Sequence, residues 1–260
     1  MIVLDWSELT EGRLKDRRAR LTIGVFDGLH LGHRELMRRV VEGRRDVMPL
    51  VITFRESPAL LMAPGSFPGL ILSLGQKLAR MATLGIGGVV LIDFSSEMSN
   101  LSGEAFIALL KENLAIEKFV VGSNFRFGRG REAGPGELKE MLSTTEVQVT
   151  EPVLWGDSVV SSSRIRKTIQ EASFSEAAAM LAGAYSIDLS GIPLVRIGAG
   201  AVRIARTDVK QVLPRAGRYP VTCAGAVGAA RGEIEIGERS LTLECPTPEG
   251  ASSVMFEYAT

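Results

Sequence analysis

The sequence is poor in residue types that define whole classes of proteins. Among its 260 residues are two cysteines and two histidines, and its 30 basic and 30 acidic side chains cancel. The two cysteines, Cys223 and Cys245, are too few and too isolated for a disulfide framework or a Cys-x-x-Cys site. We expect buried or free thiols in a reducing compartment. The neutral total argues against a general nucleic-acid binder, whose footprint is a basic surplus.

Long hydrophobic runs are missing as well. No stretch reaches the ~18 consecutive apolar residues that a membrane-spanning helix needs. The N-terminus lacks a basic segment followed by an apolar core, so we expect no signal peptide. With 45 % hydrophobic and 23 % charged residues, the composition is that of an ordinary globular protein. We predict a cytoplasmic protein without a membrane partner; protein partners and the oligomeric state stay unknown.

The two histidines stand three residues apart, at the end of the segment GVFDGLHLGH, residues 24–33. An apolar run predicted as a strand, residues 22–26, opens this segment, and a predicted amphipathic helix, residues 34–42, follows it. A glycine turn between a strand and a helix N-terminus is a ready phosphate site, because unpaired N–H groups point outward there. Histidine can donate to phosphate oxygens. The alternatives are capped histidines without a ligand and a zinc site, which lacks a third histidine.

Strands and helices alternate through the first part of the sequence. The predicted strands are 22–26, 50–54, 89–93, 118–122 and 146–149; the predicted helices are 34–42, 74–84, 102–114, 136–142, 163–171 and 175–181. Continuous apolar strands separated by helices indicate an α/β fold with a parallel sheet covered on both faces. After about Tyr185, short runs separated by glycine and proline predict a small all-β, barrel-like domain. We therefore predict two domains, residues 1–185 and 186–260.

Two further segments follow predicted strands, at the sheet edge where ligands bind in such folds. Residues 122–131 combine glycines and three arginines with Asn124, Phe125 and Phe127. Arginine suits phosphate, and a phenylalanine can lie against a flat ring. The alternative is a solvated loop with the phenylalanines in the core. Residues 53–58 form a loop shaped by Pro58, for which a plain connection is the simpler interpretation.

Serines precede the predicted helix at residues 163–171. Ser161 is a candidate N-cap, and serine hydroxyls with an arginine one turn into a helix also make an anion site. Arg164 and Arg166 are two residues apart and cannot share one helical face. We expect only one of them to reach a ligand.

Taken together, five segments resemble the prokaryotic FAD synthetases, the bifunctional riboflavin kinase/FMN adenylyltransferases. They are residues 24–33, 53–58, 72–78, 120–131 and 162–166. The resemblance implies a Rossmann-like nucleotidyltransferase domain that converts FMN and Mg-ATP to FAD and pyrophosphate. The FMN phosphate would attack the α-phosphorus of ATP in line, without a covalent enzyme intermediate.

The resemblance also implies a role for each matched residue. It makes His30, His33 and Arg166 catalytic, at the ATP phosphates. The ATP-binding residues would be Gly24, Phe26, Asp27, Gly28, Gly32, Val121, Gly122, Ser162 and Ser163, and the FMN-binding residues Phe54, Ser57, Asn124, Arg126 and Phe127. No protein metal ligand is implied, and Mg²⁺ arrives with ATP.

The sequence departs from the family pattern at two places. Ser57 stands where the family commonly has His or Asn before a proline. The G-F-P-T-A-N motif of the riboflavin kinase module is absent, and only residues 211–221 resemble a strand of that module. We therefore predict a degenerate kinase-like domain without riboflavin kinase activity. The alternatives are a nucleotidyltransferase with another phosphate acceptor and a non-catalytic flavin- or nucleotide-binding protein.

Overall fold

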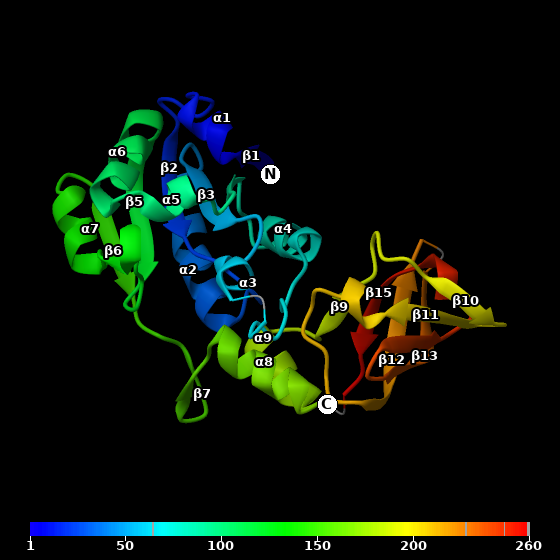
Figure 1. The fold of residues 1–260 in the computed structure, drawn as a ribbon. Helices are drawn as coiled ribbons and strands as arrows, with labels where there is room; N and C mark the ends of the chain where they lie inside the picture. Colours follow the sequence, from blue (N-terminus) through cyan, green and yellow to red (C-terminus); the bar gives the residue numbers. More distant parts are fainter. Residues whose placement is uncertain (64, 227, 247, 259–260) are drawn as a thin grey trace. The chain divides into compact units, whose positions relative to one another are not determined.

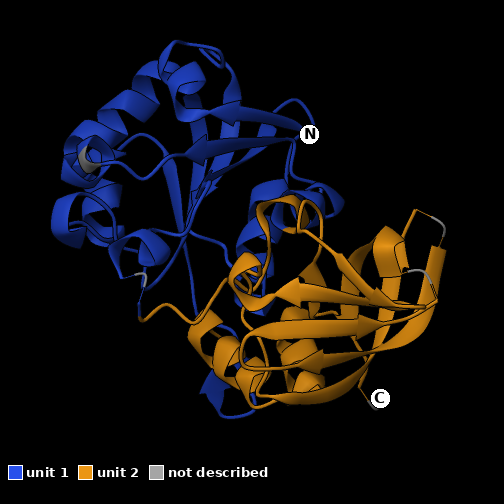
Figure 2. Cartoon of the chain, turned by 45° about the vertical axis from the view of Figure 1, so that its right-hand side comes forward, with its two compact units in different colours: residues 1–65, 77–159 blue, residues 66–76, 160–260 orange. Residues whose placement is uncertain are grey.

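The computed structural model describes residues 1–63, 65–226, 228–246 and 248–258 (Figure 1). The chain divides into two compact units, shown in Figure 2. Unit 1 consists of Met1–Gly65 and Lys77–Val159, and unit 2 of Ser66–Gln76 and Val160–Thr260. These units are a property of the contacts, whereas the predicted domains, 1–185 and 186–260, rest on sequence pattern; their boundary stays a prediction.

Unit 1 is built on a six-stranded sheet in the order β1-β4-β3-β2-β5-β6, in which every neighbouring pair is parallel. Its strands are β1 (Ile2–Asp5), β2 (Arg18–Ile23), β3 (Met48–Phe54), β4 (Gly88–Ile92), β5 (Ala115–Gly122) and β6 (Glu146–Thr150). The chain runs outward from β2 to β4 and then returns to the other side of β2, at β5. In an open α/β sheet, ligands bind outside the carboxyl ends of the strands at such a reversal.

Helices cover both faces of this sheet. The helices that lie wholly in unit 1 are α1 (Trp6–Thr10), α2 (Leu31–Val41), α3 (Pro58–Met62), α5 (Ser96–Asn100), α6 (Gly103–Asn113) and α7 (Pro135–Met141). Leu21 lies in the core with residues of α1, α6 and α7. Arg20 points to the opposite face, because side chains alternate along a strand, and its guanidinium reaches the backbone of α2. The predicted α/β architecture is therefore confirmed.

Two predicted boundaries around the histidines are wrong. β2 ends at Ile23 rather than at residue 26, and α2 begins at Leu31 rather than at residue 34. Phe26 and Leu29 have φ values of 52° and 45°, in the left-handed region that a strand excludes. The turn is therefore longer, and His33 lies inside the helix. The short elements β1, α1, α3 and α5 span too few residues for a periodic pattern.

Unit 2 contains a seven-stranded antiparallel sheet in the order β10-β11-β14-β13-β12-β15-β9. Its strands are β9 (Ser186–Asp188), β10 (Val195–Gly198), β11 (Ala201–Ala205), β12 (Gly217–Gly225), β13 (Gly228–Ile236), β14 (Ser240–Glu244) and β15 (Ala251–Phe256). This confirms the predicted small all-β architecture. The sequence pattern missed β9, which has only three residues.

Two helices of unit 2, α8 (Ser162–Gln170) and α9 (Phe174–Leu181), precede this sheet in the sequence. Phe174 at the start of α9 stacks on Phe256 of β15, with ring centroids 4.5 Å apart, and Tyr185 stacks on the same ring. These aromatic contacts pack α9 against the sheet, which explains why residues 160–185 share a compact unit with it.

The two cysteines lie in unit 2, where both are buried and free. Burial, with the Cys245 thiol beside it, raises the pKa of Cys223 to about 12. Cys223 is therefore a protonated thiol at neutral pH. The expectation of buried free thiols is confirmed.

The last two strands and α4 complete the description of strands and α-helices. The hairpin β7 (Leu154–Trp155) and β8 (Ser158–Val159) closes unit 1, and α4 (Leu74–Thr83) begins in unit 2 and continues in unit 1. Within the described residues, every helix is too short or too polar to cross a bilayer.

Candidate active site

The turn between β2 and α2 is tightly wound. Phe26, Gly28 and Leu29 all have positive φ values, of 52°, 92° and 45°. The ring of Phe26 folds back over Gly24, where an added Cβ would lie 3.0 Å from the ring carbon Cζ. A larger residue at position 24 would push this ring away. The first glycine and the phenylalanine of the segment therefore form one packed unit.

The turn brings the two histidines into direct contact. His30 is the extended N-cap residue of α2 and His33 lies in its first turn. Their rings are stacked with centroids 3.7 Å apart, and the ring of Phe26 meets His33 at nearly a right angle. A Cβ at Gly32 would lie 3.3 Å from Cε1 of His30, so this glycine leaves space for the ring. The structure therefore brings the two predicted site residues together, and their catalytic role stays a prediction.

Burial keeps both histidines neutral. It lowers the pKa of His30 to about 4. The pKa of His33 is also far below its usual value, first through burial and then through the charges of His30 and Lys77. Within the described part of the chain, Nδ1 of each ring is buried and has no hydrogen-bond partner. Buried polar atoms are nearly always paired, so these two neighbouring Nδ1 atoms suit hydrogen bonds to a ligand.

The loop after β5 presents different side chains from those expected. Phe127 is buried in the core, where it packs against Phe106, and its backbone pairs with Ala133 in both directions. Phe125 is half-buried and stacks on Phe127. The core alternative for the two phenylalanines describes these positions well.

Asn124 and Arg126, by contrast, are exposed. They are the polar groups that the loop offers beyond the carboxyl end of β5. Arg126 donates to the carbonyl of Phe125 at 2.8 Å. The predicted flavin contacts through Asn124, Arg126 and Phe127 stay predictions.

The loop after β3 carries an aromatic pair. Phe54 ends β3 and meets the edge of Phe94, just beyond β4, with centroids 5.9 Å apart. The sequence interpretation had not included Phe94. Ser57 is buried and occupies the N-cap position of α3. This loop therefore contributes a half-buried aromatic surface at the carboxyl edge of the sheet.

The serine and arginine residues at 161–166 lie at the start of α8, in unit 2. Ser161 accepts a hydrogen bond from the backbone of Arg164, which confirms the predicted N-cap. The two arginines diverge, as their spacing predicts: Arg164 pairs with Glu176, while Arg166 donates to the carbonyl of Gly69 at 2.8 Å. Because the histidines belong to unit 1, the predicted clamp with Ser162, Ser163 and Arg166 stays a prediction.

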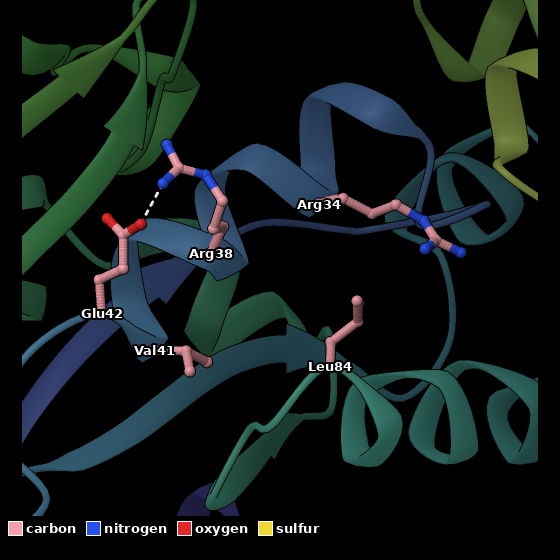
Figure 3. A pocket seen from close by; sticks show the side chains of 5 residues that line it. All are labelled: Arg34, Arg38, Val41, Glu42 and Leu84. Atoms are coloured by element: carbon pink, nitrogen blue, oxygen red, sulfur yellow. Dashed lines mark hydrogen bonds and ion pairs between the residues drawn. The ribbon is translucent and has the colours of Figure 1, made fainter.

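A pocket of about 330 Å³ lies beside α2, and none of the residues that line it is a predicted site residue. Arg34, Arg38, Val41 and Glu42 of α2 line it together with Leu84. Figure 3 shows Arg38 turned toward Glu42, with which it forms an ion pair, whereas Arg34 points the other way. Two acidic side chains, Glu35 and Glu42, already hold Arg38, so the charge of this arginine is balanced within α2.

The fold and the turn together define a Rossmann-like domain with a helix N-terminus at its topological reversal, a position that suits phosphate. Comparison with known families gives the more particular assignment. The model of the FAD synthetase family matches residues 13–164, more than half of the chain. The chain belongs to the FAD synthetase family.

Individual relatives agree with this assignment. The chain is 31 % identical, over 172 residues, to a bifunctional riboflavin kinase/FMN adenylyltransferase of Escherichia coli strain K12. That match covers 64 % of this chain and 55 % of the relative, so the chain spans little more than half of the relative's length. An FAD synthetase of Listeria monocytogenes is 29 % identical over 183 residues, which cover 68 % of this chain and 74 % of that protein.

A solved structure shares the fold of almost the whole chain. A Streptococcus pneumoniae protein, whose structure is titled as that of a macrolide-efflux protein, superposes with a TM-score of 0.82. The alignment covers 98 % of this chain and 89 % of the other, at 23 % identity. At that identity the likeness speaks for the fold only.

Proposed function

We propose that this chain is an FMN adenylyltransferase, which makes FAD and pyrophosphate from FMN and Mg-ATP. One observation carries the proposal: two stacked, neutral histidines with unpaired Nδ1 atoms stand at the N-terminus of α2, beside the reversal of the sheet. Family membership supports the same reaction, because the matched residues, 13–164, include this turn.

The site suits transfer of a nucleotidyl group without a protein nucleophile. An oxygen of the FMN phosphate would attack the α-phosphorus of Mg-ATP, and the bond from that phosphorus to the pyrophosphate oxygen would break. Such transfers ask mainly for positioning and for neutralisation of charge. The first-turn N–H groups of α2 and the N–H groups of His30 and His33 would donate to the phosphate oxygens as negative charge develops on them.

Neutral histidines can do this work as hydrogen-bond donors. A neutral imidazole carries one N–H and one acceptor nitrogen. A bound triphosphate would supply acceptors for the N–H groups, and its negative charge would raise the pKa of both rings. Binding of ATP and protonation of the histidines are therefore expected to favour each other.

The flavin end of FMN would lie at the loops that follow β3, β4 and β5. The half-buried pair Phe54 and Phe94 offers an apolar surface, and the exposed Asn124 and Arg126 offer polar groups. We keep Ser57 and Phe127 as predicted contacts, although both side chains are buried. On the ATP side, Gly24, Phe26, Asp27, Gly28, Gly32, Val121 and Gly122 remain the predicted contacts in unit 1.

The all-β part of unit 2 would lack the riboflavin kinase activity that the name of the bifunctional relatives includes. Its sequence lacks the Thr and Asn of the G-F-P-T-A-N motif. We propose that it does not phosphorylate riboflavin. A cytoplasmic location without nucleic-acid or membrane partners belongs to the same proposal; the neutral net charge supports the part that concerns nucleic acid.

The test is to incubate the purified full chain with FMN and Mg-ATP and to separate FMN from FAD. We expect FAD and an equal amount of pyrophosphate, and no FMN when riboflavin replaces FMN. Pantetheine phosphate and nicotinamide mononucleotide serve as other acceptors. If the chain binds FMN and ATP yet forms no FAD at enzyme concentrations near those of the substrates, it is a binding protein and the proposal is wrong.

A further inference from the structure

Lys77 is a buried basic residue beside the histidine turn. It lies in α4, in the part of that helix that belongs to unit 1, and is 7 % exposed. Among the lysines and arginines that the structure describes, only Arg20 and Lys77 are buried. A buried ammonium is costly unless oxygens surround it, so its position needs a reason.

The ammonium of Lys77 joins the ends of two neighbouring strands. Its Nζ donates to the carbonyl of Phe54 at 2.8 Å, to Oγ1 of Thr53 at 3.2 Å and to the carbonyl of Val25 at 3.4 Å. Thr53 in turn donates to the same Val25 carbonyl at 3.1 Å. Two donors therefore hold the carbonyl that immediately precedes Phe26, where the chain enters its left-handed turn.

These contacts leave Lys77 little capacity to bind substrate itself. An ammonium has three donor hydrogens, and three protein oxygens accept from this one. The side chain is also almost fully covered. Its effect on a ligand must therefore pass through the turn.

The charge of Lys77 interacts with two residues of the turn and of α2, Asp27 and His33. Burial lowers the pKa of Lys77 to about 8, while the nearby carboxylate of Asp27 opposes this change. The group thus remains mostly charged at pH 7. In the opposite direction, its positive charge contributes to the low pKa of His33.

We propose that Lys77 is a positioning residue of the candidate active site: by tying Val25 to Thr53 and Phe54, it fixes the turn that presents His30 and His33. The inference deepens the proposed function, on which it rests for the catalytic role of the histidines. The geometric part, that Lys77 sets the environment of the two rings, stands without any assumption about the substrate.

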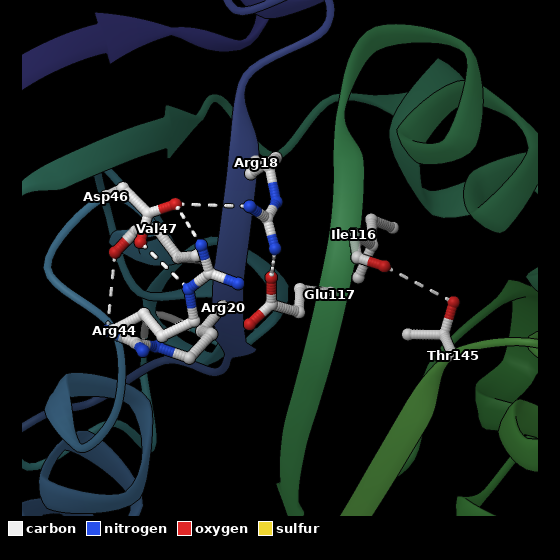
Figure 4. Close-up of polar contacts among 8 residues, drawn as sticks. All are labelled: Arg18, Arg20, Arg44, Asp46, Val47, Ile116, Glu117 and Thr145. Carbon is white, nitrogen blue, oxygen red and sulfur yellow. Dashed lines mark hydrogen bonds and ion pairs between the residues drawn. The ribbon is translucent and has the colours of Figure 1, made fainter.

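Arg20 provides a matched control, because it is the same kind of group at the other end of β2. It is 3 % exposed, and its guanidinium donates to the carbonyls of Val40, Val41 and Val47 at 2.8, 3.2 and 3.3 Å. Figure 4 shows Arg20 beside Val47 and the ion-paired Arg18. Replacing Arg20 should lower the stability of the fold, as replacing Lys77 should, but it removes no contact of the turn that precedes α2.

The experiment compares the wild type with K77M, K77R and R20M. Because the chain has only two histidines, their ring signals in NMR spectra can be titrated individually. In K77M we expect the pKa of His33 to rise, since a neighbouring positive charge is removed. We also expect kcat for FAD formation to fall about 10²-fold, because catalytic groups tolerate little misplacement.

The other two variants distinguish a loss of positioning from a general loss of stability. K77R keeps the charge, so it should restore the His33 titration and recover part of kcat. R20M should lower the unfolding temperature while leaving both histidine titrations and kcat unchanged. A folded K77M with the titrations and kcat of the wild type would overturn the inference.

Two further arms keep the test decisive. If K77M does not fold, T53V removes one of the oxygens that hold Lys77 and the hydroxyl that holds Val25, at nearly constant volume. T53V should move the His33 ring signals and lower kcat in the same direction; unchanged signals and kcat would reject the inference. If the wild type forms no FAD, the proposed function fails, whereas the NMR titrations still judge the role of Lys77.

Discussion

At each end of β2 a buried basic side chain donates hydrogen bonds to backbone carbonyls, but the two ends differ in their surroundings. At the amino end, the buried Arg20 holds three carbonyls, and Arg18 pairs with Asp46 and Glu117. At the carboxyl end, the buried Lys77 also holds backbone carbonyls. The difference lies in what surrounds each cation: the amino end is a closed network of ion pairs.

The carboxyl end, in contrast, keeps polar atoms unpaired. Nδ1 of both histidines and, at the end of β6, Oγ1 of Thr150 are buried without a hydrogen-bond partner among the described residues. Left-handed backbone also occurs there, at Phe26 and Leu29. Strain and unpaired groups cost stability and persist where function requires them. Comparing the two ends therefore teaches that β2 is held by ion pairs and buried hydrogen bonds at one end and carries the proposed ligand site at the other.

The largest expected effect comes from removing a histidine. His33→Ala should lower kcat for FAD formation at least ~10²-fold, as loss of a transition-state donor does elsewhere. Steady-state assays with FMN and Mg-ATP measure this. His33→Ala should leave the native fold intact, which circular dichroism can check. Turnover close to that of the wild type would place the chemistry away from this end of β2.

Acid should destabilise the carboxyl end selectively. The folded-state pKa of His30 is about 4, below the unfolded value near 6.5. Between these values the unfolded chain binds more protons, so the free energy of unfolding falls as pH drops from 6.5 to 4. For His30 alone the loss approaches roughly 3 kcal/mol, and His33 adds to it in the same direction.

Denaturant titrations at several pH values test this, with His30→Gln as the comparison. The carboxylates of the chain also titrate in acid, but they do so in both proteins. The free energy of unfolding of the wild type minus that of His30→Gln should therefore become smaller, or more negative, as the pH falls. A difference that does not change with pH would mean that His30 is not held neutral.

A glycine substitution should separate activity from stability. Gly32→Ala places a methyl group 3.3 Å from Cε1 of His30, so we expect the ring to move and kcat to fall about tenfold. Gly136→Ala, in α7, meets no atom within 4 Å and is the matched control. It should raise stability by about 0.5–1 kcal/mol without changing kcat. Equal kinetics in the two variants would show that the packing at Gly32 is unimportant.

The smallest effect is expected at the amino end. Arg18→Gln removes two exposed ion pairs, with Asp46 and Glu117, and exposed pairs contribute little. We expect a small decrease in the unfolding temperature and no change in kcat or in the histidine titrations. A loss of activity in Arg18→Gln would break the distinction between the two ends.

Much of the architecture could be predicted because it depends on residues that are close together in the sequence. The apolar run at residues 89–93 predicts β4, and Ser102 caps α6 by accepting a hydrogen bond from the backbone N–H of Ala105, as its position predicts. The spacing of the histidines and the glycines likewise predicted a turn at the carboxyl edge. These features depend on neighbours in the sequence, so a single sequence contains them.

The rest depends on distant partners. Lys77 would be assigned to solvent from the pattern of α4 alone; the oxygens of Val25 and Phe54, 52 and 23 residues away, explain its burial. Phe127 looks like a loop residue until its pairing with Ala133 and its contact with Phe106 draw it into the core. No local pattern contains such contacts.

The most direct test of the central claim is single-turnover formation of FAD from FMN and Mg-ATP, with the wild type and His33→Ala compared at enzyme concentrations near those of the substrates. The account predicts that the wild type forms FAD and one equivalent of pyrophosphate and that His33→Ala does so at least ~10²-fold more slowly. FAD formation at equal rates, or no FAD from the wild type, would contradict it.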